Sequence, residues 1–228
     1  NKDMAKKDFK KEDQNLENVQ EALTTNAMWI EKNQKVITWV VVAVVAVVLG
    51  IMAINQYVIK PKAAEADNEN AKAVAYFMQG DYEKALNGDD AECIGFEQIA
   101  QDYKMYQAGK LAALYAGICY YQTGEYEEAA KYLKKFSADD LTIDPAAKQL
   151  LGDAYVQMQE YDKAVKAFEA AAKSGNDLIA PMSLKKAGLV YLEMGNKKAA
   201  HKVFSAVKAD YPMSNEAQDI EKYIAIAE

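Results

Sequence analysis

The chain contains no arginine, because all 27 basic residues among its 228 are lysines. A guanidinium group therefore cannot provide bidentate binding of phosphate or carboxylate. His201 is the only histidine, and Cys93 and Cys119 show no metal-ligand spacing. Zinc sites and histidine-dependent catalytic triads thus lack their residues. The sequence predicts a protein that is not an enzyme and needs no metal or other cofactor.

Positive charge is also in deficit, since 34 acidic residues give a formal net charge of −7. Nucleic-acid binding depends on clustered lysine and arginine, so we expect no nucleic-acid partner. The two cysteines leave two interpretations open. Cys93 and Cys119 could pair in an oxidising compartment, but the sequence favours two small buried hydrophobic residues.

A long apolar run is present instead, from Val36 to Ile54, without charge or proline. A bilayer core about 30 Å thick needs roughly 20 apolar residues at 1.5 Å each, so this run predicts a transmembrane helix over residues 36–58. A buried core helix would carry a polar stripe, whereas Thr38 is the only polar side chain here. A signal peptide would have a shorter apolar region.

Small residues recur on one face of this span, at spacings of 3, 4 and 3. Small side chains let a second transmembrane helix approach closely. The candidate transmembrane packing face comprises Ala43, Ala46, Gly50 and Ala53. A chance pattern in a span rich in valine and alanine is the alternative.

Residues 1–35 form a polar tail in which we expect a short amphipathic helix. Its candidate docking face comprises Leu16, Val19, Leu23, Ala27 and Ile30, at helical spacing. This face either lies on the bilayer with Trp29 as an interfacial anchor or docks a membrane partner. Lysines near the span are balanced, but the tail adds more. The positive-inside rule therefore places the N-terminus inside and the large domain outside.

A repeated pattern dominates the remainder of the chain. Gly117, Gly152 and Gly188 are separated by 35 and 36 residues, and each is followed three positions later by tyrosine. Other residues follow in register: Tyr120, Tyr155 and Tyr191; Ala129, Ala164 and Ala200; Leu133, Phe168 and Phe204. Small residues at fixed points let paired helices cross closely, while the large ones fill the space between pairs. A generic helical bundle with accidental periodicity is the alternative.

The pattern resembles the tetratricopeptide-repeat superfamily over residues 66–228. The resemblance implies an all-α solenoid of about four helix pairs plus a closing helix, anchored by one N-terminal transmembrane helix. Residues 59–71 are a linker or the start of the first repeat helix, and residues 72–228 are the repeat domain. Asn87 to Ala91 interrupts the first repeat, which predicts a longer loop between its two helices. Ser214 is expected to cap the closing helix, which runs to Ala227.

The first helices of such repeats line a concave groove. The candidate partner groove comprises Val74, Phe77, Leu114, Ile118, Tyr121, Val156, Leu189 and Leu192. Lys185 alone cannot clamp a carboxylate, so an apolar segment of a partner or client protein is expected there. The alternative is that the linker after Pro61 or the closing helix covers part of the groove.

The stretch Trp29 to Lys35, WIEKNQK, together with the tail, span and repeats, resembles the YfgM-like family of bacterial inner-membrane proteins. The resemblance implies a cytoplasmic N-terminus and a periplasmic repeat domain. It also implies protein partners, namely the Sec translocon, a PpiD-like periplasmic chaperone and newly exported client chains. Two other interpretations stay open: a scaffold subunit of another bacterial envelope complex, for secretion or motility, and a cytosol-facing targeting receptor with reversed topology.

Overall fold

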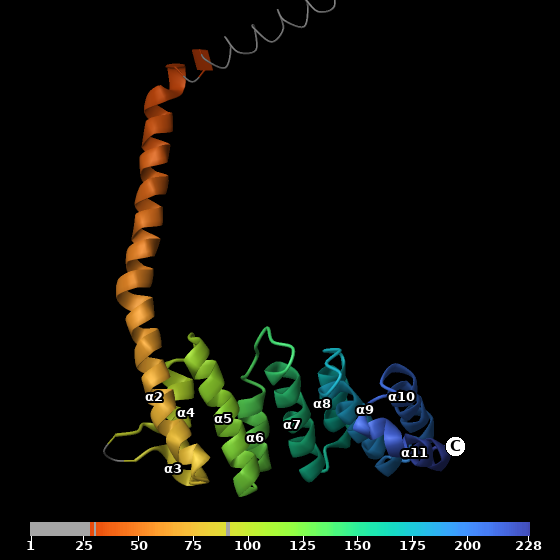
Figure 1. Ribbon diagram of the computed structural model, residues 1–228. Coiled ribbons are helices and arrows are strands. Elements are labelled where there is room, and N and C mark those ends of the chain that lie inside the picture. Colours follow the sequence, from red (N-terminus) through yellow and green to blue (C-terminus); the bar gives the residue numbers. More distant parts are fainter. Residues whose placement is uncertain (1–27, 30, 90–91) are drawn as a thin grey trace, which may run out of the picture. The chain divides into compact units, whose positions relative to one another are not determined.

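The computed structural model describes residues 28–29, 31–89 and 92–228, and all regular secondary structure in these ranges is helical (Figure 1). The chain divides into two compact units, Asn1–Pro61 and Lys62–Glu228. The candidate tail docking face, Leu16, Val19, Leu23, Ala27 and Ile30, lies outside the described residues and stays a prediction.

The first unit carries the apolar run as a helix. In the described part of the chain, the one helix long and apolar enough to cross a membrane is Glu31–Met78. The Thr38 hydroxyl donates to the Gln34 carbonyl oxygen over 2.8 Å. The single polar side chain of the run is thus satisfied within the helix, as a hydrocarbon environment requires. A π-helical turn, η1 (Asn55–Ile59), follows the run.

The second unit is built from helix pairs that stand side by side in chain order (Figure 1). The first helices of the pairs are α2 (Lys60–Met78), α5 (Gln107–Thr123), α7 (Ile143–Gln157) and α9 (Ile179–Glu193). The second helices are α3 (Tyr82–Asn87) with α4 (Gly95–Asp102), α6 (Tyr126–Leu133), α8 (Tyr161–Ala172) and α10 (Lys197–Asp210). The closing element is η2 (Asn215–Asp219) followed by α11 (Ile220–Ile226). The predicted solenoid of four pairs with a closing helix is confirmed.

The in-phase glycines mark the crossing point of each pair. A Cβ atom built on Gly117 would lie 2.6 Å from Leu133 Cγ, and one on Gly152 would lie 2.5 Å from Phe168 Cε1. Gly188 stands in the same relation to the Phe204 ring. Contacts this short leave no room for a methyl group, so glycine lets each first helix lie directly against the large side chain of its second helix.

The helical structure breaks at Gly88, within the predicted insertion Asn87 to Ala91, but this break does not separate the two helices of the first pair. The turn between α2 and α3 is short, and the Asp81 side chain caps α3 by accepting from the Lys84 backbone N–H over 3.2 Å. The extra residues instead split the second helix into α3 and α4. Gly88 and Gly95 flank the split with φ of 82° and 75°, a conformation that favours glycine. The longer loop therefore interrupts a helix and does not separate the two helices of the pair.

The closing element covers the last pair as expected. Ser214 Oγ accepts from the Ala217 backbone N–H over 3.2 Å, which caps the 3-10 turn before α11. Ile220 is fully buried in a cluster with Phe204 and Val207 of α10. The apolar face that the last pair would otherwise expose is thereby removed from water.

Both cysteines are free and buried. Cys119 belongs to the core cluster that runs from the first pair to α9 of the fourth, and burial raises the pKa of its thiol to about 12. Cys93 packs in the same cluster beside α4. Each thiol therefore behaves as a small core residue, and the two are not joined by a disulfide.

Candidate partner-binding surface

The first helices present the residues predicted to form the groove, but most of these residues also join neighbouring helices. Leu114 is buried and Leu189 is exposed, whereas the other six are half-buried: Val74, Phe77, Ile118, Tyr121, Val156 and Leu192. Leu114 and Ile118 pack in a cluster with Leu133 of α6. Leu192 packs in the cluster under the closing helix. Their exposed apolar area is consequently smaller than the sequence suggested.

Two leucines on these helices remain open to solvent. Leu111 of α5 is 37% exposed and Leu189 of α9 is 42% exposed. When Gly117 and Gly188 are counted as the eighth residues of their repeats, Leu111 is at position 2 and Leu189 at position 9, both of which we expect on the concave face. They lie on different repeats, with α7 between them in the chain. A ligand that touches both must therefore extend along the solenoid.

Polar contacts fill the surface between these leucines. Lys186 Nζ of α9 donates to both carboxylate oxygens of Asp153 on α7, over 2.8 and 2.6 Å. Burial raises the pKa of Asp153, while the Lys186 ammonium opposes that rise. Gln149 Oε1 accepts from the hydroxyl of the fully buried Ser183 over 3.2 Å. The first helices of the third and fourth repeats are thus linked by an ion pair and an amide contact.

Lys185, the one cation predicted to lie in the groove, already has a partner. Its Nζ lies 2.5 Å from Asp219 Oδ1 at the end of η2, and this ion pair lowers the pKa of the Asp219 carboxyl. Asp219 of the closing element therefore already pairs with the Lys185 ammonium group that a carboxylate ligand would need. An uncharged segment fits this surface better than an acidic chain terminus.

A second set of contacts was not foreseen from the sequence. Glu97 Oε1 of α4 accepts from the hydroxyls of Tyr120 and Tyr132, over 2.6 and 2.7 Å. Glu169 Oε1 of α8 accepts from the Tyr191 hydroxyl over 2.7 Å. In each case a repeat tyrosine reaches back to the preceding pair. These contacts fix the angle between successive pairs.

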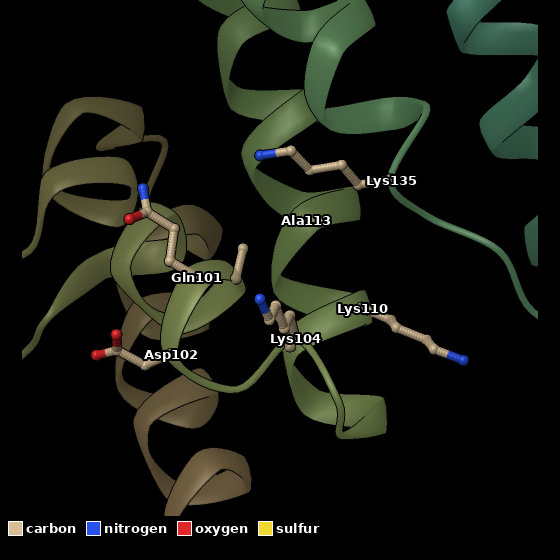
Figure 2. A pocket seen from close by; sticks show the side chains of 8 residues that line it. Gln101, Asp102, Lys104, Lys110, Ala113 and Lys135 are labelled. Carbon is tan, nitrogen blue, oxygen red and sulfur yellow. The ribbon is translucent and has the colours of Figure 1, made fainter.

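A hollow of about 570 Å³ lies between α4, the start of α5 and the end of α6. Figure 2 shows the Lys104 and Lys135 side chains pointing toward it, while Asp102 and Lys110 point away. Lys135 Nζ is held 4.0 Å from the centroid of the Tyr132 ring. No sequence spacing joins these residues, because they come from three separate segments.

The small residues of the span, Ala43, Ala46, Gly50 and Ala53, are all exposed along the helix of the first unit. A Cβ atom built on Gly50 would meet no atom within 4 Å. The face is accordingly open to another helix, and its role in packing stays a prediction. In the described part of the chain, no group of His, Cys, Asp or Glu residues could hold a metal ion.

The helix pairs, their in-phase glycines and the closing helix define a tetratricopeptide-like repeat protein, a class of protein-interaction modules. Solved structures agree with this fold. The crystal structure of MamA protein has a TM-score of 0.57 at 20% identity, covering 71% of this chain and 80% of that one. The Podospora anserina putative kinesin light chain repeats have a TM-score of 0.52 at 14% identity, covering 72% and 85%.

The family described as "T7SS, ESX-1 secretion system protein EccA1, N-terminal domain" matches residues 13–221. The chain belongs to this family. Comparison with curated proteins gives no match.

Proposed function

We propose that the protein is a membrane-anchored interaction subunit that assists newly exported proteins, with its repeat domain on the outer side of a bacterial inner membrane. One observation carries the proposal: an apolar span precedes a helical-repeat domain whose first-helix surface keeps Leu111 and Leu189 exposed. Membership of a family named for a secretion system supports a role in export. The resemblance to YfgM-like proteins favours the Sec translocon and a PpiD-like chaperone as partners.

The first-helix surface, defined by Leu111, Leu189 and the polar contacts between them, suits an extended segment of a client chain. The two leucines provide apolar contacts at separate points. Lys186 and Asp153 neutralise one another, so the surface has no uncompensated charge there to reject an apolar chain. Binding of an unfolded or partly folded export client follows from these properties.

The test replaces both exposed leucines with aspartate. The Leu111→Asp, Leu189→Asp variant should lose crosslinks to exported chains in native membranes, because aspartate places a charge where apolar contact is needed. Ile226→Asp is the matched control, since Ile226 is 48% exposed on α11 and lies outside the candidate groove. Equal urea midpoints for the three proteins establish intact folding. Undiminished crosslinking by the leucine variant would disprove the groove.

A second function rests on the family match itself: a scaffold subunit of another envelope secretion complex. The repeats would then hold one fixed subunit, and the small residues of the span would pack against a helix of that complex. Gentle detergent purification followed by mass spectrometry separates the two functions. Many exported chains support the client function, whereas one subunit in fixed ratio supports the scaffold.

A further inference from the structure

Each of the three loops that join one helix pair to the next, and the loop that joins the last pair to the closing element, presents one strongly exposed apolar side chain. Met105, Leu141, Leu178 and Met213 are 83%, 72%, 68% and 95% exposed. They follow one another at intervals of 36, 37 and 35 residues, so each occupies the same place in its repeat. We call these four loops, with those residues, the loop edge.

Contacts between the loops show that the loop edge is continuous. Lys104 and Lys135, from the first and second loops, line the same hollow (Figure 2). Asn176 Nδ2 of the third loop donates to the Leu141 carbonyl oxygen of the second over 2.9 Å. Asp177 and Met213, from the third and fourth loops, line another hollow of about 300 Å³. The four apolar side chains therefore occupy one side of the repeat domain.

The repeat domain begins at this same edge. Asn70 Nδ2 of α2 donates to the Ala108 carbonyl oxygen over 2.7 Å, and Glu65 hydrogen-bonds to the Tyr103 hydroxyl. The early turns of α2 consequently lie beside the first loop, and α2 ends at the opposite edge. The unit starts at Lys62, only three residues after Ile59, and these residues are already helical because α2 begins at Lys60.

We propose that the loop edge contacts the interface of the lipid bilayer and that its four apolar side chains enter the headgroup region. The proposal rests on the membrane anchorage proposed above. Unbranched and γ-branched apolar side chains on loop tips gain by leaving water for this region. Lys104 and Lys135 have stems long enough to reach the headgroups beside them. The second unit would thus lie with one side on the membrane.

The chemistry of the loops favours lipid of low net charge. Asp139 and Asp140 precede Leu141, and Asp177 precedes Leu178, so acids offset the lysines of the loop edge. Electrostatic attraction to anionic lipid is therefore weak, and burial of apolar side chains has to supply the contact. Quenching by labelled lipid should accordingly persist in vesicles of phosphatidylcholine alone.

Single exposed apolar residues are ordinary on protein surfaces, so the test needs a matched control. Met78 supplies one: in the described part of the second unit, it is the one other large apolar side chain more than half exposed, at 78%. It lies at the end of α2, on the edge opposite the loops. Met78 and Met105 therefore differ in edge but not in residue type or exposure.

The experiment uses the full chain in phosphatidylcholine vesicles that contain nitroxide-labelled lipid and no other protein. Single-cysteine variants Met105→Cys, Leu178→Cys and Met78→Cys carry a fluorophore, in a background with Cys93→Ala and Cys119→Ala. Nitroxide at the headgroup should quench the labels at positions 105 and 178 several-fold more than the label at 78. Adding Leu141→Asp and Met213→Asp should reduce the quenching at position 105.

A fluorophore on Met52→Cys, within the span, distinguishes failure of the proposed loop-edge contact from failure of the membrane anchorage. If nitroxide on the lipid acyl chains quenches the label at position 52 while headgroup nitroxide quenches positions 78 and 105 equally, the span is in the membrane and the proposed contact of the loop edge is wrong. If position 52 is not quenched, the anchorage itself is wrong and the contact falls with it. Stronger quenching at 105 than at 78 supports both.

Discussion

At the scale of single residues, Gly152 constrains how closely α7 and α8 cross. A methyl group there would lie 2.5 Å from the Phe168 ring. Helix propensity alone would make Gly152→Ala stabilising by about 1 kcal/mol. Overpacking costs about 1–3 kcal/mol, so we expect a net loss in the free energy of unfolding, measured by urea denaturation. The sign of the change distinguishes the two effects.

A double-mutant cycle with Phe168→Leu provides the control for that prediction. Leucine occupies the equivalent place at Leu133, opposite Gly117, so the exchange is compatible with the repeat. The smaller side chain should recover part of the loss caused by Gly152→Ala. Strictly additive losses would mean that the methyl group and the ring do not meet.

Glu97 supports a pH-dependent contribution to stability. The pKa values of Tyr120 and Tyr132 are both raised, mainly by burial and secondly by the hydrogen bond to the Glu97 carboxylate. The pKa of Tyr132 reaches about 12. A tyrosine whose folded pKa exceeds the ordinary value of 10.0 stabilises the fold below pH 10. That contribution falls as pH rises through the folded pKa, since the unfolded chain then holds fewer protons.

Glu97→Gln should therefore lower the free energy of unfolding by about 1–2 kcal/mol at pH 7, because the hydroxyls lose a charged acceptor. The difference from the natural chain should persist at pH 10 and narrow only as pH approaches the folded pKa of the tyrosines, about 12 for Tyr132, where a carboxylate beside tyrosinate is no longer favourable. Urea titrations from pH 7 to 12, with tyrosinate absorbance, measure both effects. A difference independent of pH would contradict the assigned contact.

Some residue contacts were predictable and others were not. The glycines and their large partners recur 16 residues apart in the second, third and fourth repeats, for example at positions 152 and 168, so their spacing alone indicates a close crossing. Tyr120 contacts Glu97 and Tyr191 contacts Glu169, 23 and 22 residues earlier in the chain, whereas Tyr132 and Leu133 occupy those places before Tyr155. A contact that one of the three repeats lacks, at a spacing that varies, gives no clear periodic signal, and the folded chain was needed to show it.

At the scale of elements, the closing helix protects the last repeat. Ile220 is fully buried against α10, so Ile220→Ala should cost about 2–5 kcal/mol. A solenoid repeat contacts only its neighbours, so the loss should appear as faster hydrogen exchange in α9 to α11, with α5 to α7 unchanged. Ile226→Ala, at a half-exposed position of the same helix, should change exchange little. Uniform acceleration throughout the domain would contradict this local cost.

The insertion shows how far element boundaries follow from sequence. Tyr82 and Ala85 occupy second-helix positions of the repeat, so the second helix had already begun before Asn87. The repeat positions of Tyr82 and Ala85 were therefore sufficient to predict that the insertion interrupts the second helix of the first pair. The prediction of an inter-helix loop failed because loops usually lie between elements, whereas paired glycines here allow a helix to stop and restart.

The groove illustrates a different limit. Repeat register identified the first-helix face, but exposure depends on neighbours that only the fold brings together. Ile118 and Leu192 share that face with Leu189, yet both are half-buried against adjacent helices. The proposed binding at this face therefore relies on Leu111 and Leu189 more than on the wider set of eight.

At the scale of the whole molecule, the lysine distribution predicts the topology that both proposals require. The tail should be inside and the repeat domain outside, because the tail carries more lysines. Chains with one added cysteine, Lys6→Cys in the tail or Met78→Cys in the repeat domain, test this in spheroplasts with a maleimide that does not cross membranes. The natural cysteines are buried and should not react. Position 78 should label in intact spheroplasts and position 6 only after detergent, whereas the reverse pattern would make the repeat domain a cytosolic receptor and remove export clients as its ligands.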